Sequence, residues 1–226
     1  MSSKRGRPRR KTRFMRRMKA YLYGGVFILG LLLAVLIVMK VFGLGQFNNV
    51  YVEQEDNYMH IEKPNIDVQL LSVNMYSRPG LQSEKIKNIV IHYTANPGTS
   101  AMQNRNYFEG LKDSKKRKAS SHFVVGIEGE IVQCVPTWEI AYASNDRNSD
   151  TVSIETCHRE ESGAYTDATY QSLVHLTAWL CEKFGLTEED VIRHYDITGK
   201  NCPKYFVENE EAWNTFKKDI KLKLEE

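Results

Sequence analysis

Acidic residues are missing from the first 39 positions of this 226-residue chain, although residues 1–19 hold ten Lys or Arg. Residues 20–39 carry no charge at all and are rich in Leu, Val and Ile. At about 1.5 Å per residue, such a run is long enough to cross the roughly 30 Å hydrocarbon core of a bilayer. The sequence therefore predicts a cytoplasmic basic arm over residues 1–19 and a transmembrane helix over residues 20–42.

A cleaved signal peptide is the alternative, but its apolar region usually spans about 7–15 residues and ends in small residues. Here the apolar run continues into Lys40, Val41 and Phe42. Because Lys and Arg stay on the cytoplasmic side, the arm places the N-terminus inside and residues from about 45 onward outside the cell. We expect a single-pass protein of the cell membrane with an extracellular domain.

The charge of the arm could also attract nucleic acid, but its only aromatic residue is Phe14. Anionic lipid headgroups account for the charge without a further partner, so we expect no nucleic acid. The rest of the chain is acidic, because the arm and Lys40 take 11 of the 31 basic residues and leave 20 against 28 acids, a net charge of −8.

Internal repeats are absent and cysteine is scarce, with four in the whole chain. Cys202 is a candidate metal ligand, which leaves Cys134, Cys157 and Cys181 as an odd set in apolar surroundings. We interpret these three as small buried hydrophobic residues, with one disulfide among them as the alternative.

Hydrophobic patterning separates a polar linker over residues 43–66 from a single folded domain over residues 67–226. Gly129 lies in a tight hairpin signal, Glu128-Gly129-Glu130. Apolar, β-branched runs predict buried strands, and apolar residues at helical spacing predict helices. The strands are expected at 88–91, 123–127, 131–135 and 152–156, and the helices after Ser100, at 167–184 and at about 210–224. The order predicts an α/β domain, a central mixed β-sheet flanked by α-helices.

Two segments have the character of a zinc site, Ile91-His92-Tyr93-Thr94-Ala95 and Arg193-His194-Tyr195 continuing to Cys202-Pro203. His92, His194 and Cys202 would leave a tetrahedral zinc one ligand short, as catalytic sites do. Gly199 and Pro203 mark a loop that can fold the cysteine back toward the second histidine. The alternative is two satisfied core histidines and an ordinary buried cysteine.

These segments resemble the zinc-dependent N-acetylmuramoyl-L-alanine amidases of the type 2 family, which includes phage lysozyme-type amidases and peptidoglycan recognition proteins. The similarity is greatest to cell-wall amidases and phage endolysins of Gram-positive bacteria. It extends over nearly the whole domain, through Tyr76-Ser77-Arg78-Pro79-Gly80, Asn96-Pro97-Gly98-Thr99-Ser100, Arg105-Asn106-Tyr107-Phe108 and Pro203-Lys204-Tyr205. The resemblance implies the type 2 amidase fold, and zinc held by His92, His194 and Cys202.

Glu155 and Lys200 are the expected catalytic residues. Glu155 ends an apolar strand, where a carboxylate either faces solvent or lies near a metal site. The resemblance implies that it takes the proton from water and passes it to the leaving amine. Lys200, otherwise a surface lysine, is expected to stabilise the oxyanion.

Two positions depart from the family pattern. Ser121 replaces a catalytic tyrosine of phage lysozyme-type members, and Ala141-Tyr142-Ala143-Ser144 lies where many relatives have a tryptophan-histidine pair. His122 and Tyr142 are expected to contact substrate in the cleft. The remaining histidines, His60, His158 and His175, are interpreted as surface residues, and Lys115-Lys116-Arg117-Lys118 as a solvated loop.

The resemblance implies a peptidoglycan amidase that cleaves the bond between the lactyl group of N-acetylmuramic acid and L-alanine, and the apolar run after the basic arm predicts that it is membrane-anchored. A binding module without activity is one alternative, although such relatives generally lose a zinc ligand. A zinc peptidase that cuts within the stem peptide is the other.

Overall fold

The computed structural model describes residues 21, 23, 30 and 59–226 of the chain. The predicted basic arm, nearly all of the predicted transmembrane segment and most of the predicted linker lie outside these residues. Within the described part, no helix combines the length and apolar character needed to cross a bilayer.

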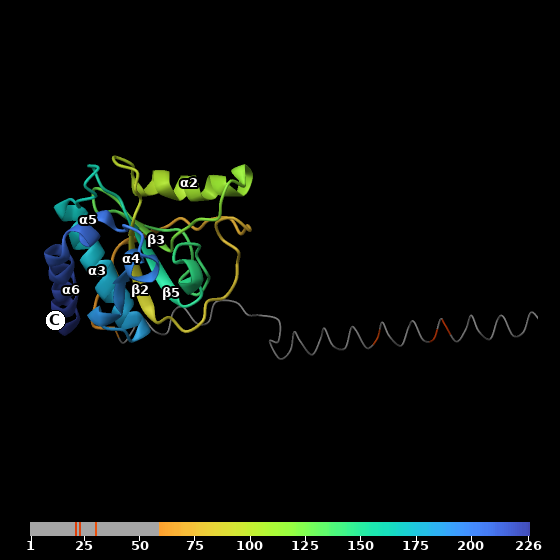
Figure 1. The fold of residues 1–226 in the computed structure, drawn as a ribbon. Coiled ribbons are helices and arrows are strands. Elements are labelled where there is room, and N and C mark those ends of the chain that lie inside the picture. Colours follow the sequence, from red (N-terminus) through yellow and green to blue (C-terminus); the bar gives the residue numbers. More distant parts are fainter. Residues whose placement is uncertain (1–20, 22, 24–29, 31–58) are drawn as a thin grey trace, which may run out of the picture. The chain divides into compact units, whose positions relative to one another are not determined.

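A six-stranded sheet forms the centre of the domain, with the strands in the order β1-β4-β3-β5-β2-β6 (Figure 1). Only β3 and β4 pair antiparallel, and every other neighbouring pair is parallel. The strands are β1 (Ile66–Val68), β2 (Asn88–Tyr93), β3 (Phe123–Val125), β4 (Ile131–Gln133), β5 (Thr151–Thr156) and β6 (Val191–Arg193). The prediction of a mixed sheet is confirmed.

Three long helices accompany the sheet, α2 (Ala101–Ser114), α3 (Asp167–Phe184) and α6 (Glu210–Glu225). Their ends follow local signals in the sequence. Ser100 and Thr166 accept hydrogen bonds from backbone N–H groups of the first turns of α2 and α3, and Gly185 ends α3 at φ 65°. Short helices α4 (His194–Thr198) and α5 (Lys204–Glu208) and the 3-10 turns η2 (Asn145–Arg147) and η3 (Glu188–Asp190) complete the domain.

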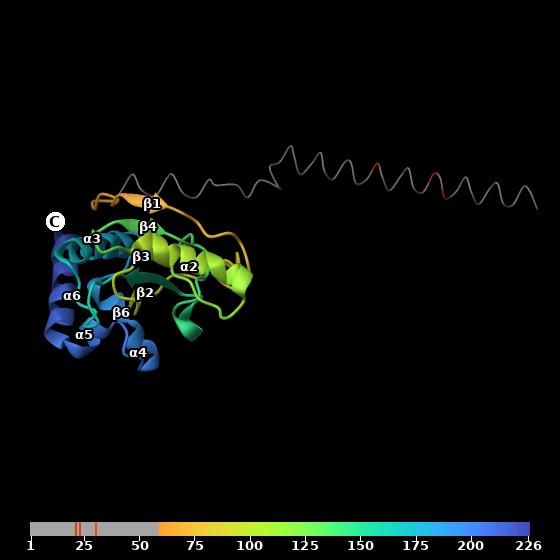
Figure 2. The ribbon, with the colours of Figure 1, turned by 90° about the horizontal axis from the view of Figure 1, so that it is seen from above.

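Separate hydrophobic cores cover the two faces of the sheet. Side chains of α3 and α6 pack with Ile91, Phe123 and Ile154 in one core, whereas Phe108 and Leu111 of α2 pack with Val124 in the other. Figure 2 shows α2 apart from the pair formed by α3 and α6. Both faces are therefore covered by helices, as predicted for an α/β domain.

The alternation of side chains along β2 and β5 fixes the place of the candidate site. Ile91 and Ile154 point into the core under α3 and α6, so their successors His92 and Glu155 point to the face that carries α2. The two residues are direct partners in the parallel register of β2 and β5. They lie at the carboxyl ends of the strands, where open α/β sheets bind ligands.

The folded domain begins earlier than the expected boundary at residue 67. Ile61 is only 8% exposed and belongs to the core under α3 and α6. The backbone N–H groups of His60 and Ile61 donate to the Glu182 carboxylate at 2.6 and 2.8 Å. The end of the predicted linker is therefore part of the domain.

The interpretation of His158 as a surface residue is wrong. Its side chain is 1% exposed, its ring lies 5.2 Å from that of Tyr93, and Nδ1 donates to the carbonyl of Glu160 at 2.8 Å. The residue lies two positions after the end of β5, behind the buried Cys157, whereas the charged residues that follow it in sequence suggested a surface loop. Cys134, Cys157 and Cys181 are buried free thiols, in agreement with the hydrophobic interpretation.

Candidate metal centre and active site

His92, His194 and Cys202 come from three parts of the chain and meet in one place. His92 lies near the end of β2 and His194 opens α4. Gly199 ends α4 at φ 73°, and the backbone N–H of Tyr195 then donates to the carbonyl of Cys202 at 2.9 Å. The predicted loop thus brings the cysteine back beside the histidine.

The donor atoms of these three residues all lie within 4.8 Å of one another. Cys202 Sγ is 3.9 Å from His92 Nδ1, and the two imidazole ring centres are 4.6 Å apart. All three side chains are buried, with exposures of 2%, 7% and 2% for His92, His194 and Cys202. Two imidazoles and one thiol at this spacing suit a tetrahedral zinc with a fourth position open.

The protonation states suit a metal as well. Burial, with the neighbouring His194 and Lys200, holds the pKa of His92 well below its usual range, and burial also lowers the pKa of His194. Both imidazoles are therefore neutral at pH 7, the form that binds metals. His92 Nε2 and His194 Nδ1 are buried and have no hydrogen-bond partner among the described residues. Unsatisfied buried nitrogens are costly, so these atoms fit metal binding.

Glu155 lies beside His92 in the neighbouring strand. Burial raises the pKa of its carboxyl group to about 8, and the charges of Lys200 and Arg117 act in the opposite direction. Its Oε2 is buried and has no partner within the described part of the chain. A carboxyl group whose pKa lies near neutrality and that has a free oxygen suits proton transfer.

Lys200 follows α4 and its charge acts on His92, His194 and Glu155 alike, lowering the pKa of each. The lysine side chain is exposed and lines the same cavity as these three residues. Its charge can therefore reach an oxygen placed between the metal ligands and Glu155.

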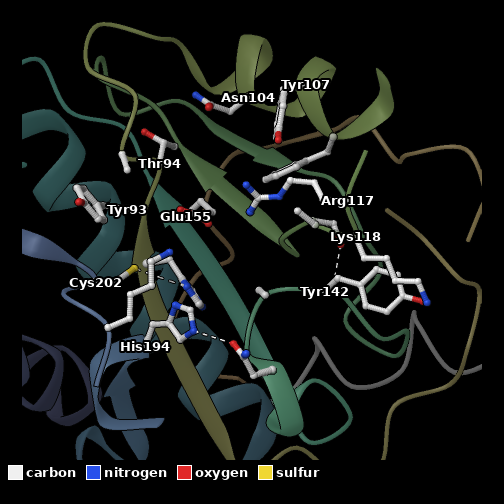
Figure 3. Close-up of a pocket in the computed structure, with 18 of the residues that line it drawn as sticks. Tyr93, Thr94, Asn104, Tyr107, Arg117, Lys118, Tyr142, Glu155, His194 and Cys202 are labelled. Atoms are coloured by element: carbon white, nitrogen blue, oxygen red, sulfur yellow. Dashed lines mark hydrogen bonds between the residues drawn. The ribbon is translucent and has the colours of Figure 1, made fainter. Parts of the chain in front are cut away.

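This cavity has a volume of about 960 Å³, and its lining residues come from segments spread between residues 92 and 202. The metal ligands, Glu155 and Lys200 line one part of it, where Figure 3 shows His194, Cys202 and Glu155. The other part is formed by Asn104, Tyr107 and Phe108 of α2, by Arg117 and Lys118 of the following loop, and by Tyr142. Tyr142 thus lies where a substrate contact was predicted.

His122 does not line this cavity, so the predicted substrate contact is wrong. Its ring is 1% exposed and has partners on both nitrogens. Nδ1 accepts from the backbone N–H of Ser153 at 3.0 Å, and Nε2 donates to the carbonyl of Glu139 at 2.9 Å. Ser121, in the position of the family tyrosine, is likewise turned inward and donates to the carbonyl of Phe123 at 2.8 Å.

Sequence reasoning missed Asn145, which contacts a predicted ligand directly. Its side-chain oxygen lies 3.0 Å from His194 Nε2. Asn145 itself has φ 55°, and its loop is held by Asn148 Oδ1, which accepts from the backbone N–H groups of Ala143 and Ser144. The only local sign that Asn145 has a special place is its positive φ, which the structure shows but the sequence does not.

Comparison with known proteins agrees with this geometry. The family model described as N-acetylmuramoyl-L-alanine amidase matches residues 82–205, more than half of the chain. The chain belongs to the N-acetylmuramoyl-L-alanine amidase family. The matched residues include both histidines, Glu155 and Cys202, and the predicted resemblance to type 2 amidases is confirmed.

Two Bacillus proteins illustrate the relationship. The amidase CwlL of Bacillus licheniformis is 38% identical over 163 residues, which cover 66% of this chain and 45% of that protein. The amidase BlyA of Bacillus subtilis is 34% identical over 175 residues, covering 68% and 46%. The chain spans about half the length of the curated relatives it matches.

Solved structures show the same fold. The catalytic domain of XlyA superposes with a TM-score of 0.60 at 25% identity, covering 70% of this chain and 99% of that domain. PlyL superposes with a TM-score of 0.61 at 23% identity, covering 70% and 98%. The amidase domain of this chain therefore has the architecture of these neighbours.

Proposed function

We propose that this family member is a zinc-dependent peptidoglycan amidase that hydrolyses the bond between the lactyl group of N-acetylmuramic acid and L-alanine. The observation that carries the proposal is the meeting of His92, His194 and Cys202 beside Glu155 in one cavity. Membership of the amidase family supports the choice of bond.

His92, His194 and Cys202 would hold the zinc, which supplies a Lewis acid for the carbonyl group and its attacking water. The carboxylate of Glu155 takes a proton from that water as the oxygen attacks the carbonyl carbon. Lys200 stabilises the negative charge that develops on the carbonyl oxygen. Glu155 then gives its proton to the amide nitrogen as the carbon–nitrogen bond breaks, which releases the L-alanyl amine and a lactyl carboxylate.

Replacement of Glu155 by Ala tests this assignment. We expect the variant to keep its zinc, because its ligands are intact, and to release stem peptides from purified peptidoglycan about 10²–10⁴-fold more slowly. Glu161→Ala, a change at an exposed glutamate of a nearby loop, is the matched control and is expected to retain full activity. Hydrolysis by Glu155→Ala at the wild-type rate would exclude Glu155 as the group that transfers the proton.

Product analysis separates the amidase from its two alternatives. An amidase leaves glycan strands with free lactyl carboxylates, whereas a peptidase leaves cut stem peptides. Stoichiometric zinc without any product would support a binding module. The presence of both histidines, Cys202, Glu155 and Lys200 in one cavity favours the amidase.

The proposed place of action rests on the sequence alone. The uncharged run at 20–39 after ten basic residues supports a membrane anchor with the amidase domain outside the cell, next to its substrate. Protease added to intact cells should remove the domain and leave the basic arm protected. Recovery of the whole chain from the soluble cytoplasmic fraction would contradict this location.

A further inference from the structure

The charges in the cavity are strongly unbalanced. Arg117, Lys118 and Lys200 line it, and Glu155 is the only acidic residue among its lining side chains. The chain beyond Lys40 has 20 basic and 28 acidic residues and so a net charge of −8. The positive charge of the cavity is therefore local and does not follow from the net charge of the domain. Lys200 is assigned to the oxyanion in the proposed hydrolysis, whereas Arg117 and Lys118 have no assigned step, although the charge of Arg117 acts against burial to lower the pKa of Glu155.

The backbone holds Arg117 and Lys118 between two fixed points. Lys115 ends α2 with φ 54°, and its N–H donates to the carbonyl of Leu111 at 2.9 Å. Ala119 is buried, and its N–H donates to the carbonyl of Tyr76 at 3.0 Å. Only three residues lie between these anchors, so the two cations are placed at the cavity wall.

Arg117 has no hydrogen-bond or ion-pair partner among the described residues, unlike most of the arginines there. Arg78, Arg147, Arg159 and Arg193 each form a salt bridge at 2.7–3.0 Å. The guanidinium group of Arg117 instead points into the cavity on the side of Glu155 (Figure 3), and its charge acts to lower the pKa of that carboxyl group. Lys118 lies 5.1 Å above the ring of Tyr142, another residue of this wall. A guanidinium group offers a planar fork of donors that matches a carboxylate.

We propose that Arg117, assisted by Lys118, binds a free carboxylate of the stem peptide and so selects substrates whose second residue is not amidated. This rests on the proposed amidase function, because the scissile carbonyl must lie at the metal end. The residue after L-alanine in stem peptides is a D-glutamyl residue whose α-carboxyl group is either free or amidated. Two residues extend at most about 7 Å, so this group stays inside a cavity that holds the scissile bond. The lactyl carboxyl group of the muramoyl residue forms the scissile amide itself, so a free carboxylate at Arg117 must come from the peptide.

Two muramoyl peptides that differ only in this group test the proposal with the full chain. One carries D-isoglutamate and the other D-isoglutamine at the second position. We expect the wild type to cleave the free acid with a kcat/KM at least about tenfold higher, since a hydrogen-bonded charge pair discriminates by that order. Arg117→Gln should lower kcat/KM for the acid about tenfold more than for the amide, because loss of the carboxylate contact affects only the acid, whereas the accompanying rise in the pKa of Glu155 affects both peptides alike.

Lys116→Gln is the matched control, because Lys116 precedes Arg117 in the same loop but does not line the cavity. It should leave both rates and their ratio unchanged. Equal cleavage of the two peptides by the wild type, or an equal loss on both in Arg117→Gln, would overturn the carboxylate site while leaving the amidase function standing.

If neither peptide is cleaved, measured affinities for the two peptides distinguish a failure of the amidase function from a failure of the carboxylate site. Glu155→Ala should bind the free acid at least about tenfold more tightly than the amide, and the double variant with Arg117→Gln should bind both alike. Preference in binding without turnover would contradict the amidase function and retain the carboxylate site. Equal binding by both variants would overturn the site.

Discussion

The side-chain oxygen of Asn145 lies 3.0 Å from Nε2 of His194 and fixes which nitrogen of that imidazole carries the proton. An amide oxygen can only accept, so Nε2 donates and Nδ1 keeps its lone pair. Nδ1 is the buried nitrogen that has no partner in the described part of the chain. Asn145 therefore prepares His194 for a metal before any metal binds.

Asn145→Gly should weaken zinc binding by about 10–100-fold, the usual effect of losing a partner of a metal-bound histidine. Glycine accepts the backbone at φ 55° without strain, so the change removes the side chain and leaves the loop intact. Asn145→Asp retains an acceptor and should bind zinc nearly as tightly as the wild type. Competition with a chromogenic chelator measures the affinities, and wild-type affinity in the glycine variant would exclude the positioning role.

Zinc uptake should release protons at neutral pH. Burial, reinforced by the nearby charge of Glu155, raises the pKa of Cys202 to about 12, so its thiol is protonated until a metal replaces the proton. Binding should release about one proton from Cys202, and the affinity should rise with pH. Glu155, with a pKa of about 8, adds to the release because a nearby cation favours its charged form.

Calorimetric titration in buffers of different protonation enthalpy counts these protons. Glu155→Ala isolates the contribution of Cys202 and should still release about one proton. A zinc affinity that does not change between pH 6.5 and 8.5 would show that the thiol does not bind the metal as a thiolate.

Local signals explain why the long helices could be predicted from the sequence. The apolar period, the caps Ser100 and Thr166 and the glycine at 185 all act within a few residues of the ends they determine. Strands β1 and β6 were missed because each short run contains a charged residue, Asp67 or Arg193, and depends on pairing with β4 or β2, whereas the equally short β3 and β4 lie within longer apolar runs. The N-terminal boundary was misplaced for the same reason, since Ile61 becomes a core residue only by contact with the distant α3.

The residues of the candidate site also differ in whether the sequence alone could identify them. His92, His194, Cys202 and Glu155 could be proposed because their chemistry is rare in apolar segments and the family resemblance placed them together. Asn145 and Arg117 look like ordinary loop residues, and only the folding of their loops against the cavity gives them a role. His122 was misassigned because its sequence does not show that Ser153 and Glu139 occupy both ring nitrogens.

His122 should make the metal-free protein sensitive to mild acid. Burial lowers its pKa to about 4, against an ordinary value of 6.5. The unfolded chain takes up a proton as the pH falls through 6.5, whereas the folded protein does not until about pH 4. The contribution of the neutral His122 to the free energy of unfolding is therefore complete above pH 6.5. It falls by about 3 kcal/mol as the pH drops from 6.5 to 4.

His122→Asn should reduce this loss, because Asn can accept from the N–H of Ser153 but does not titrate. It should also cost about 1–2 kcal/mol at pH 7.5, since the carbonyl of Glu139 loses its donor. His60→Asn changes an exposed histidine and should leave the pH dependence as it is. Urea midpoints at pH 7.5 and 4.5 measure the effect, and parallel losses in all three proteins would refute the assignment to His122.

The N-terminal segment of the domain should contribute measurably to stability. A chain that begins at residue 67, the boundary expected from composition, lacks Ile61 and the two backbone donors to Glu182. Compared with a chain that begins at residue 59, we expect a free energy of unfolding lower by about 2–5 kcal/mol, the usual range for deleting a buried isoleucine side chain. Ile61→Ala in the longer chain should account for most of this difference, whereas Val73→Ala, at a side chain that is 65% exposed, should change little. Chemical denaturation of the four proteins measures the differences. Equal free energies of unfolding for the chains that begin at residues 59 and 67 would show that residues 59–66 belong to the linker.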